Sequence, residues 1–232
     1  MRMICFPHAG GFSQYYSFLK KGNYQRISEI ELYEYPGRTY HDLDAIPKCW
    51  NAFIEKITAH LQNTLTEKES YVLFGHSMGA FVAYETAVAM DKQYHHPPEL
   101  VFLSGQRPPC TLEKGYFNSD PAVAVPFCKN LGGMENLLNA DERVQNFFLP
   151  IMLHDIQLLE TYHPTLPAKE NRLPACVLMY GEEDVELKSR DMRLWLKHFI
   201  KIKGEFSFPG GHFYLDSCHE KIVRIIDEMT II

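Results

Sequence analysis

Residues 71–80 read Tyr-Val-Leu-Phe-Gly-His-Ser-Met-Gly-Ala, and the rest of the chain is organised around this stretch. Its first four residues, with a β-branched side chain and two aromatic ones, predict a short buried strand. The segment from Met78 to Met90 is rich in alanine and carries apolar residues at helical spacing, which predicts a helix. Between them, Gly75-x-Ser77-x-Gly79 is typical of a strand-to-helix turn that presents a serine nucleophile.

The glycines of this turn have a physical reason. The turn requires a strained backbone at Ser77, and a Cβ at either flanking position would crowd the neighbouring strand or helix. Ser77 would then lie at the positive end of a helix, where a developing oxyanion is stabilised. The bare pattern is weak, because it recurs by chance in roughly one chain in ten of this length. The alternative is a glycine-flanked structural turn, and the strand and helix around it favour the nucleophile.

The composition of the 232 residues suits one folded α/β domain: 46% are hydrophobic and 22% charged. A net charge of −6 without a basic stripe argues against nucleic acid as a partner. No apolar run approaches the roughly 20 residues of a membrane span, and the start is too short for a signal peptide. Six cysteines occur singly, which indicates reduced core thiols. We therefore expect a cytoplasmic protein that associates with no membrane.

Segments with strand patterns alternate with helical ones along most of the chain. Strands are expected at 3–6, 29–35, 71–74, 99–104, 175–180 and, at an edge, 205–208; helices are expected at 12–19, 44–66, 78–90, 189–200 and 218–229. This alternation predicts a mostly parallel central sheet with helices on both faces, in a single domain over residues 1–232. Pro47 is expected in the first turn of its helix.

Residues from about 115 to 171 break the alternation and predict a helical insertion. Its expected helices are 120–131, 135–139, 141–149 and 150–162, with Asp141 as an N-cap and Pro150 in the first turn of the last helix. A wide apolar stripe runs along the last two (Val144, Phe147, Phe148, Ile151, Met152, Leu158 and Leu159). The stripe either packs on the core or forms the underside of a lid over a channel to Ser77.

Three loops beyond expected strand ends carry the residue types of acyl transfer. A serine nucleophile needs a base, and the base needs a carboxylate to orient it. The chain order Ser77, Asp184, His212 is that of the α/β-hydrolases. We favour Asp184 as the acid; Glu182 and Glu183 compete with it, and Asp216 ranks fourth, well behind them.

Further candidates surround this set. The loop His8-Ala9-Gly10-Gly11 is either a plain turn or an oxyanion-hole loop, whose N–H groups need the close approach that glycine allows. Arg38 ends a turn signal, Pro36-Gly37-Arg38, and either only turns the chain or points toward the site. His76 lies inside the turn, and we expect its side chain to point away from Ser77. His8, Arg38 and His76 are the candidate substrate-pocket residues. No cofactor and no metal site is indicated.

Seven motifs in this order and spacing resemble the type II thioesterases of nonribosomal peptide and polyketide synthesis, essentially from end to end. They are Phe6-Pro7-His8-Ala9-Gly10-Gly11, Pro36-Gly37-Arg38, Gly75-His76-Ser77-Met78-Gly79, Ser104-Gly105-x-x-Pro108-Pro109, Leu131-Gly132-Gly133, Leu149-Pro150-Ile151 and Gly210-Gly211-His212-Phe213. The chain departs from the family at Asp184-Val185, where Asp-Pro is frequent. Where the lid of the family usually carries Arg-Ala-Asp after Leu-Pro-Ile, this chain keeps only the aspartate, Asp155.

The resemblance implies an α/β-hydrolase fold with an inserted helical lid. It also implies a serine thioesterase that removes wrongly loaded acyl groups from the phosphopantetheine arm of acyl or peptidyl carrier proteins. Ser77 would be the nucleophile, His212 the base and Asp184 the acid of an acyl-enzyme mechanism, with the N–H groups of Ala9 and Met78 as the oxyanion hole. The alternatives are a small-molecule carboxylesterase or lipase of the same fold, and a non-catalytic carrier-binding module. A monomer is expected by default.

Overall fold

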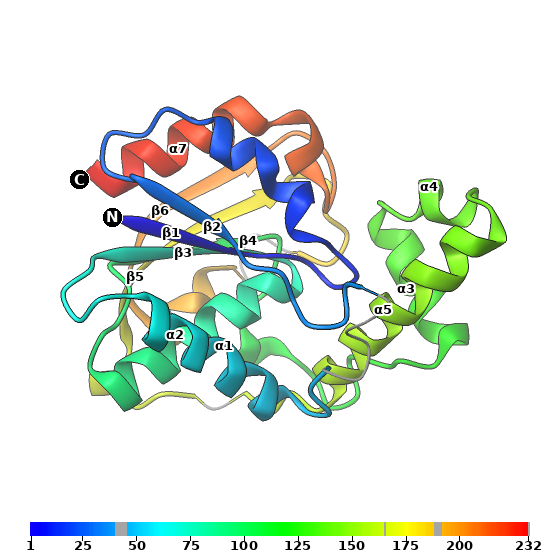
Figure 1. Ribbon diagram of the computed structural model, residues 1–232, viewed down its shortest axis with the longest axis horizontal. Coiled ribbons are helices and arrows are strands. Elements are labelled where there is room, and N and C mark those ends of the chain that lie inside the picture. Colours follow the sequence, from blue (N-terminus) through cyan, green and yellow to red (C-terminus); the bar gives the residue numbers. More distant parts are fainter. Residues whose placement is uncertain (40–45, 165, 188–191, 232) are drawn as a thin grey trace.

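The computed structural model describes residues 1–39, 46–164, 166–187 and 192–231. In this part of the chain a single sheet of parallel strands has the order β2-β1-β3-β4-β5-β6 (Figure 1). The strands are β1 (Arg2–Phe6), β2 (Glu29–Leu32), β3 (Tyr71–His76), β4 (Leu100–Ser104), β5 (Leu173–Gly181) and β6 (Phe199–Phe208). The predicted parallel sheet is confirmed, and β3 with the serine turn lies near its centre.

Helices cover both faces of the sheet. On one face lie α1 (Trp50–Thr64) and α2 (Met78–Tyr94); on the other lie the 3-10 helix η1 (Ser13–Lys21) and α7 (His219–Ile231) (Figure 1). Successive residues of a strand point to opposite faces. In β3, Leu73 accordingly packs in the core cluster of α1 and α2, while Val72 and Phe74 pack in the cluster of α7.

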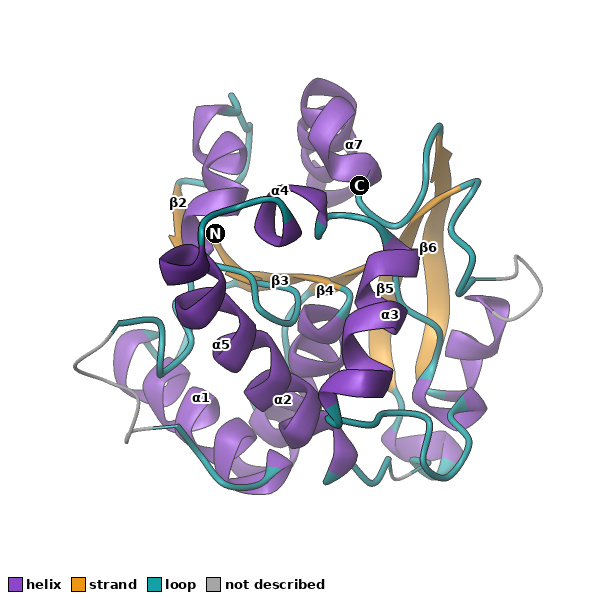
Figure 2. Cartoon of the chain, turned by 90° about the vertical axis from the view of Figure 1, so that its right-hand side faces the viewer, coloured by secondary structure: helices purple, strands orange, loops and turns teal. Residues whose placement is uncertain are grey.

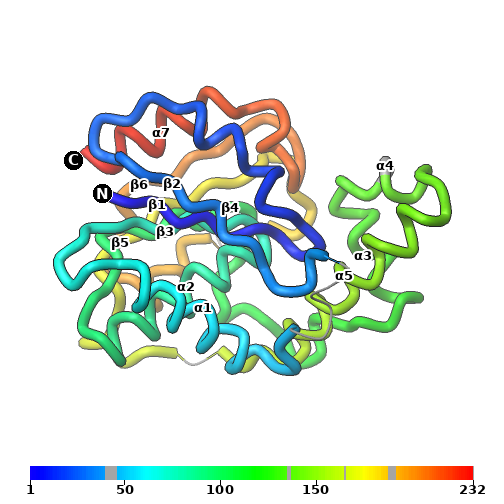
Figure 3. The backbone as a smooth tube through the Cα atoms, viewed as in Figure 1, coloured from blue at the N-terminus to red at the C-terminus, as the bar shows by residue number. Residues whose placement is uncertain are grey.

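A helical insertion between β4 and β5 stands at the carboxyl end of the strands. It contains α3 (Pro121–Leu131), α4 (Glu135–Leu138) and α5 (Glu142–Glu160), and Figure 2 looks onto it from that end. The tube in Figure 3 shows that both chain ends lie at the opposite end of the sheet. A small separate core of Ala124, Met134, Met152 and Ile156 holds the insertion together. Short 3-10 helices complete the described elements: η3 (Pro109–Thr111), η4 (Lys169–Asn171), η5 (Arg193–Lys197) and η6 (Tyr214–Ser217).

The expected break of the insertion at Pro150 is wrong, because α5 continues through it. A proline inside a helix removes one hydrogen bond and costs about 3 kcal/mol when nothing compensates. Pro150 is exposed, so water can solvate the carbonyl that its missing N–H leaves free. Asp141 caps the helix by accepting from the N–H groups of Arg143 and Val144. Apolar side chains that are partly buried before Pro150 (Phe147, Phe148 and Leu149) and fully buried after it (Ile151 and Met152) then favour one helix over two.

Two other expected helices differ from the structure. The predicted helix over 189–200 is reduced to η5 among the described residues, because Phe199 already begins β6 by pairing with Leu173. The edge strand is therefore ten residues long rather than four. The helix expected from residue 44 begins at Trp50, whose N–H donates to Thr161 Oγ1 over 2.8 Å. Pro47 thus precedes the helix, and residue 44 lies outside the described residues.

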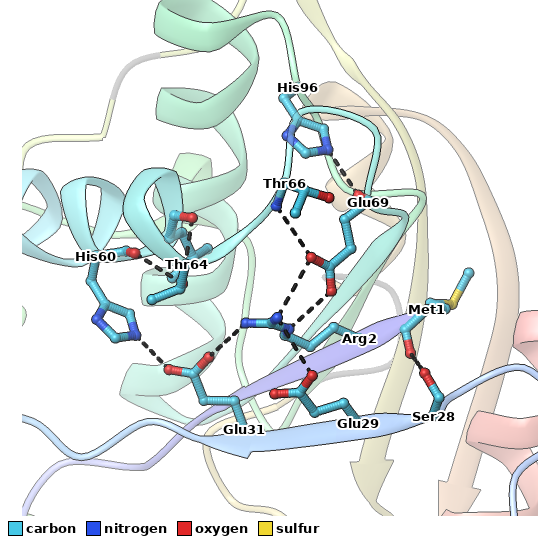
Figure 4. A network of polar contacts seen from close by, with 11 residues as sticks. Met1, Arg2, Ser28, Glu29, Glu31, His60, Thr64, Thr66, Glu69 and His96 are labelled. Atoms are coloured by element: carbon cyan, nitrogen blue, oxygen red, sulfur yellow. Dashed lines mark hydrogen bonds and ion pairs between the residues drawn. The ribbon is translucent and has the colours of Figure 1, made fainter.

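The start of β1 is held by a polar network away from the insertion (Figure 4). The Arg2 side chain, 13% exposed, donates to Glu69 Oε1 over 3.1 Å and lies 3.4 Å from Glu29. His60 in turn lies 2.6 Å from Glu31. These partly exposed pairs contribute about 1 kcal/mol or less each.

The cysteines are all free, as expected, but only Cys5 and Cys176 are fully buried. Along the described ranges, no helix combines the length and apolarity that crossing a bilayer requires.

Candidate active site

The turn after β3 is built so tightly that only glycine fits beside the serine. A Cβ on Gly75 would lie 1.9 Å from the Gly79 carbonyl oxygen, and one on Gly79 would lie 2.1 Å from the Phe6 carbonyl oxygen. Ser77 itself has φ 57° and ψ −124°, a conformation that costs a non-glycine residue about 1–3 kcal/mol. The N–H of Ser77 donates to the Ser104 carbonyl over 2.8 Å, which helps to hold this conformation. The turn therefore places Ser77 directly before the N-terminus of α2.

The loops after β5 and β6 meet at the same edge of the sheet. A Cβ on Gly181 would lie 2.1 Å from the Gly211 carbonyl oxygen, and the Glu183 N–H donates to the Gly210 carbonyl over 3.0 Å. This close approach brings Asp184 to His212, whose Nδ1 lies 2.7 Å from Asp184 Oδ2. The two side chains are 0% and 4% exposed, so water hardly screens the contact.

The structure separates Asp184 from the carboxylates that compete with it in the sequence. Glu182 and Glu183 are both exposed, and Glu182 Oε1 accepts from Ser207. Asp216 accepts from the Tyr15 hydroxyl instead. Asp184 also accepts the Glu186 N–H at Oδ1 over 3.1 Å, which fixes the orientation of its carboxylate. Of these four groups, Asp184 is the one in contact with His212.

A cavity of about 420 Å³ lies between this edge of the sheet and the helical insertion. Ser77, His212, His8, Ala9 and Met78 line it on the side of the sheet. Its other walls are mostly apolar side chains of the insertion (among them Ala124, Phe127, Met134, Phe148, Met152 and Leu159). The Nε2 atom of His212 has no hydrogen-bond partner among the described residues. Hydrogen bonds between nucleophile and base are often formed only when substrate is bound.

The loop after β1 borders this cavity through His8, Ala9 and Gly10. Three of its amides already donate elsewhere: His8 N–H to Tyr16 Oη, Gly10 N–H to Asp155 Oδ2 and Gly11 N–H to the His8 carbonyl. Among the described residues, this leaves only the N–H of Ala9 without an acceptor in the stretch from His8 to Gly11, and Ala9 is the residue expected to form half of an oxyanion hole. The His8 ring lines the cavity with its Nδ1 2.8 Å from Tyr16 Oη. Burial, with the nearby His212 and Arg38 charges, lowers the pKa of His8 to about 3, so the ring is neutral.

Arg38 and His76, expected near the substrate, do not line the cavity. Arg38 is 4% exposed and forms an ion pair with Asp155 of α5, with 2.6 Å between Nη2 and Oδ2. His76 shares its side of β3 with Phe74, because strand residues alternate between faces. Its ring is fully buried 5.0 Å from the His212 ring, so it contacts the proposed base and not the cavity.

Sequence reasoning assigned no role to several residues that support this site. Ser104 Oγ lies 2.8 Å from His76 Nδ1 and 2.6 Å from Tyr214 Oη, a buried chain of polar groups behind His212. Burial and the neighbouring His212 and His8 hold the pKa of His76 well below its usual range. The Ser104-Gly105 motif in the sequence was a signal that could have pointed to Ser104. Among the described residues, no cluster of three or more histidines, cysteines or carboxylates could hold a metal ion.

Comparison with known proteins identifies the family. Residues 1–230 match the model of the thioesterase domain family. "Thioesterase PikA5" of Streptomyces venezuelae is 27% identical over 100% of this chain and 82% of its own length. The "Probable cadicidin biosynthesis thioesterase" of Streptomyces griseus is 30% identical over 93% of this chain and 58% of its own length.

The fold also matches solved structures. The crystal structure of ClbQ from the colibactin NRPS/PKS pathway superposes with a TM-score of 0.85 over 99% of this chain and 96% of ClbQ, at 22% identity. A thioesterase family, as the seven sequence motifs indicate, is thus confirmed by the family model, and the expected fold by the superposition. The chain belongs to the thioesterase domain family, and it is a thioester hydrolase with the α/β-hydrolase fold.

Proposed function

We propose that this thioesterase removes acyl groups from the phosphopantetheine arm of carrier proteins in nonribosomal peptide or polyketide synthesis. The observation that carries the proposal is the buried Asp184–His212 pair at the cavity that also contains Ser77. The names of the relatives support the pathway class, since they include a cadicidin biosynthesis thioesterase. The mostly apolar walls of the cavity suit an aliphatic or aromatic acyl chain.

In the proposed mechanism, His212 Nε2 takes the proton of Ser77 Oγ as that oxygen attacks the thioester carbonyl. Asp184 accepts from Nδ1 and stabilises the imidazolium that forms. The N–H groups of Ala9 and Met78 hold the oxyanion. The carbon–sulfur bond then breaks, and the pantetheine thiolate leaves with the proton from His212. Water activated by His212 attacks the acyl-enzyme, which releases the acid and restores Ser77.

In this proposal residues 1–232 form one domain, and the helical insertion over about 115–171 acts as its lid. The lid would exclude water from the acyl-enzyme until the thiol has left, which is the usual role of such segments. The carrier protein would present its arm from outside, so the enzyme needs no cofactor of its own. We expect it to act as a monomer in the cytoplasm, where such synthases and their carriers work.

The test measures release of acyl groups from acetyl- and longer acyl-phosphopantetheinyl carrier proteins, beside matched acyl-CoA and p-nitrophenyl esters. We expect faster turnover on the carrier, lost in a folded Ser77→Ala variant. Turnover confined to small esters would replace the proposal by an esterase. A wild-type protein in which a fluorophosphonate fails to label Ser77 would favour a non-catalytic binding module.

A further inference from the structure

The Arg38–Asp155 ion pair is buried beside the proposed oxyanion loop. The side chains are 2% and 3% exposed, and two contacts join them: 2.6 Å from Nη2 to Oδ2 and 3.3 Å from Nη1 to Oδ1. A buried pair is weak evidence of stabilisation, because removing both charges from water costs several kcal/mol per ion. Its location therefore suggests a role other than stability.

The pair joins three segments that are far apart in the sequence. Arg38 follows β2, Asp155 belongs to α5, and both bind the loop after β1. Asp155 Oδ2 accepts the Gly10 N–H over 2.7 Å, and Arg38 Nε donates to the Gly11 carbonyl over 3.0 Å. Side chains thus fix two peptide links of this loop: Asp155, from the lid, holds the N–H of the Ala9–Gly10 link, and Arg38 holds the carbonyl of the Gly11–Phe12 link.

Apolar contacts reinforce this connection. Gly10 has φ +73°, and a Cβ there would lie 2.9 Å from the Cβ of Met152, one turn before Asp155 on α5. Phe12, at the end of the loop, packs edge-on against Phe148 of the same helix at 5.2 Å between ring centroids. Displacement of α5 would therefore displace the loop that carries Ala9.

The pairing also neutralises the negative charge of Asp155 close to the proposed oxyanion donor. An unpaired carboxylate one residue from the oxyanion donor would repel the negative charge that develops in the transition state. The Arg38 guanidinium neutralises Asp155 and leaves it as an acceptor for Gly10. The carboxylate can then hold the loop without opposing the reaction.

We propose that Arg38 and Asp155 are positioning residues, which tie the lid helix to the oxyanion loop and so place the Ala9 N–H for the transition state. The inference rests on the proposed function. It requires that loss of the pair act on kcat, since the acyl chain binds to other residues of the cavity.

The test uses paired substitutions, because one unpaired buried charge can prevent folding. Arg38→Met with Asp155→Leu keeps the volume but removes the acceptor for Gly10. Arg38→Gln with Asp155→Asn is also uncharged and keeps that acceptor. Arg2→Met with Glu69→Gln removes a distant pair as a control (Figure 4).

For the apolar pair we expect a folded protein whose kcat on acyl carrier falls about 10- to 100-fold. This loss is smaller than, or similar to, the loss in rate that follows removal of one oxyanion-hole donor. We expect KM to stay within about threefold of the wild-type value, because ground-state contacts persist. The polar pair should recover most of the lost kcat, and the control pair should behave as wild type. Backbone hydrogen exchange of residues 8–12 should accelerate in the apolar pair alone.

A folded apolar pair with wild-type kcat and wild-type exchange would overturn the inference while the proposed function stands. A loss of kcat with unchanged exchange would equally overturn it, since the loop would not have moved. If the wild-type protein hydrolyses no thioester, the proposed function fails. The proposed positioning role of Arg38 and Asp155 in catalysis then fails as well, whatever the hydrogen exchange shows.

Discussion

Replacing Asp184 by asparagine tests the proposed triad with the least change in shape. In the wild-type protein, Asp184 Oδ2 accepts from His212 Nδ1 and Oδ1 accepts from the Glu186 N–H. An asparagine must place its amide oxygen where Oδ1 was, because only an acceptor can face the Glu186 N–H. Its NH₂ group then faces His212 and donates to Nδ1. The imidazole is left with its proton on Nε2, where it cannot act as the base for Ser77.

The expected loss in kcat is about 10⁴-fold, or about 5 kcal/mol in the activation barrier, as for other triads with the wrong tautomer. Hydrolysis of acyl carrier measures it, and nitrogen NMR of His212 reports the tautomer. Circular dichroism checks that the variant is folded. Glu182→Gln and Glu183→Gln, at exposed positions next to Asp184, should keep near wild-type activity. A folded Asp184→Asn variant within about tenfold of wild type would refute the assigned role of Asp184 and the forced orientation of the amide.

Three further predictions concern the core, the cavity and the turn. Burial, followed by the Lys197 charge, lowers the pKa of His198 to about 4, so unfolding takes up a proton between about pH 4 and 6.5. The free energy of unfolding should therefore decrease as the pH is lowered through this window, by up to about 1.4 kcal/mol per pH unit. In urea titrations at pH 7 and pH 5, the difference in the free energy of unfolding between the two pH values should be smaller for His198→Gln than for the wild-type protein. Ala124→Phe should fill part of the cavity and lower kcat/KM for a long acyl chain by about tenfold or more, with little change for an acetyl substrate. Equal losses for the long-chain and the acetyl substrate would argue that Ala124 does not limit chain length. Gly79→Ala should destabilise the protein by more than about 3 kcal/mol in thermal or urea melts despite the helix propensity of alanine, because its Cβ meets the Phe6 carbonyl; wild-type stability would contradict the tight packing of the turn.

Local chemistry made part of this site predictable from the sequence. The glycines around Ser77 are required by contacts of about 2 Å between a would-be Cβ and a carbonyl, and a requirement of that kind leaves a pattern in the sequence. Alternating strands and helices likewise predicted the parallel sheet and the edge at which its loops meet.

Choices that depend on contacts between distant segments could not be made in the same way. Nothing in Gly181-Glu182-Glu183-Asp184 distinguishes three adjacent carboxylates. The choice comes from how the loop closes against Gly210 and Gly211, after which only Asp184 points inward. Arg38 posed the same difficulty, since its partner Asp155 lies 117 residues away. The turn signal before it contained no information about that partner.

The wrong expectation at Pro150 bears most directly on mechanism. A break there would have divided the insertion into two helices that could move separately. In the continuous α5, Val144 and Phe148 line the cavity before Pro150, and Met152, Asp155 and Leu159 contact the loop or the cavity after it. One rigid helix thus touches both the space for the acyl chain and the loop that carries Ala9. An acyl chain that repositions α5 must also move this loop, so the fit of the chain can affect the rate of hydrolysis as well as its binding.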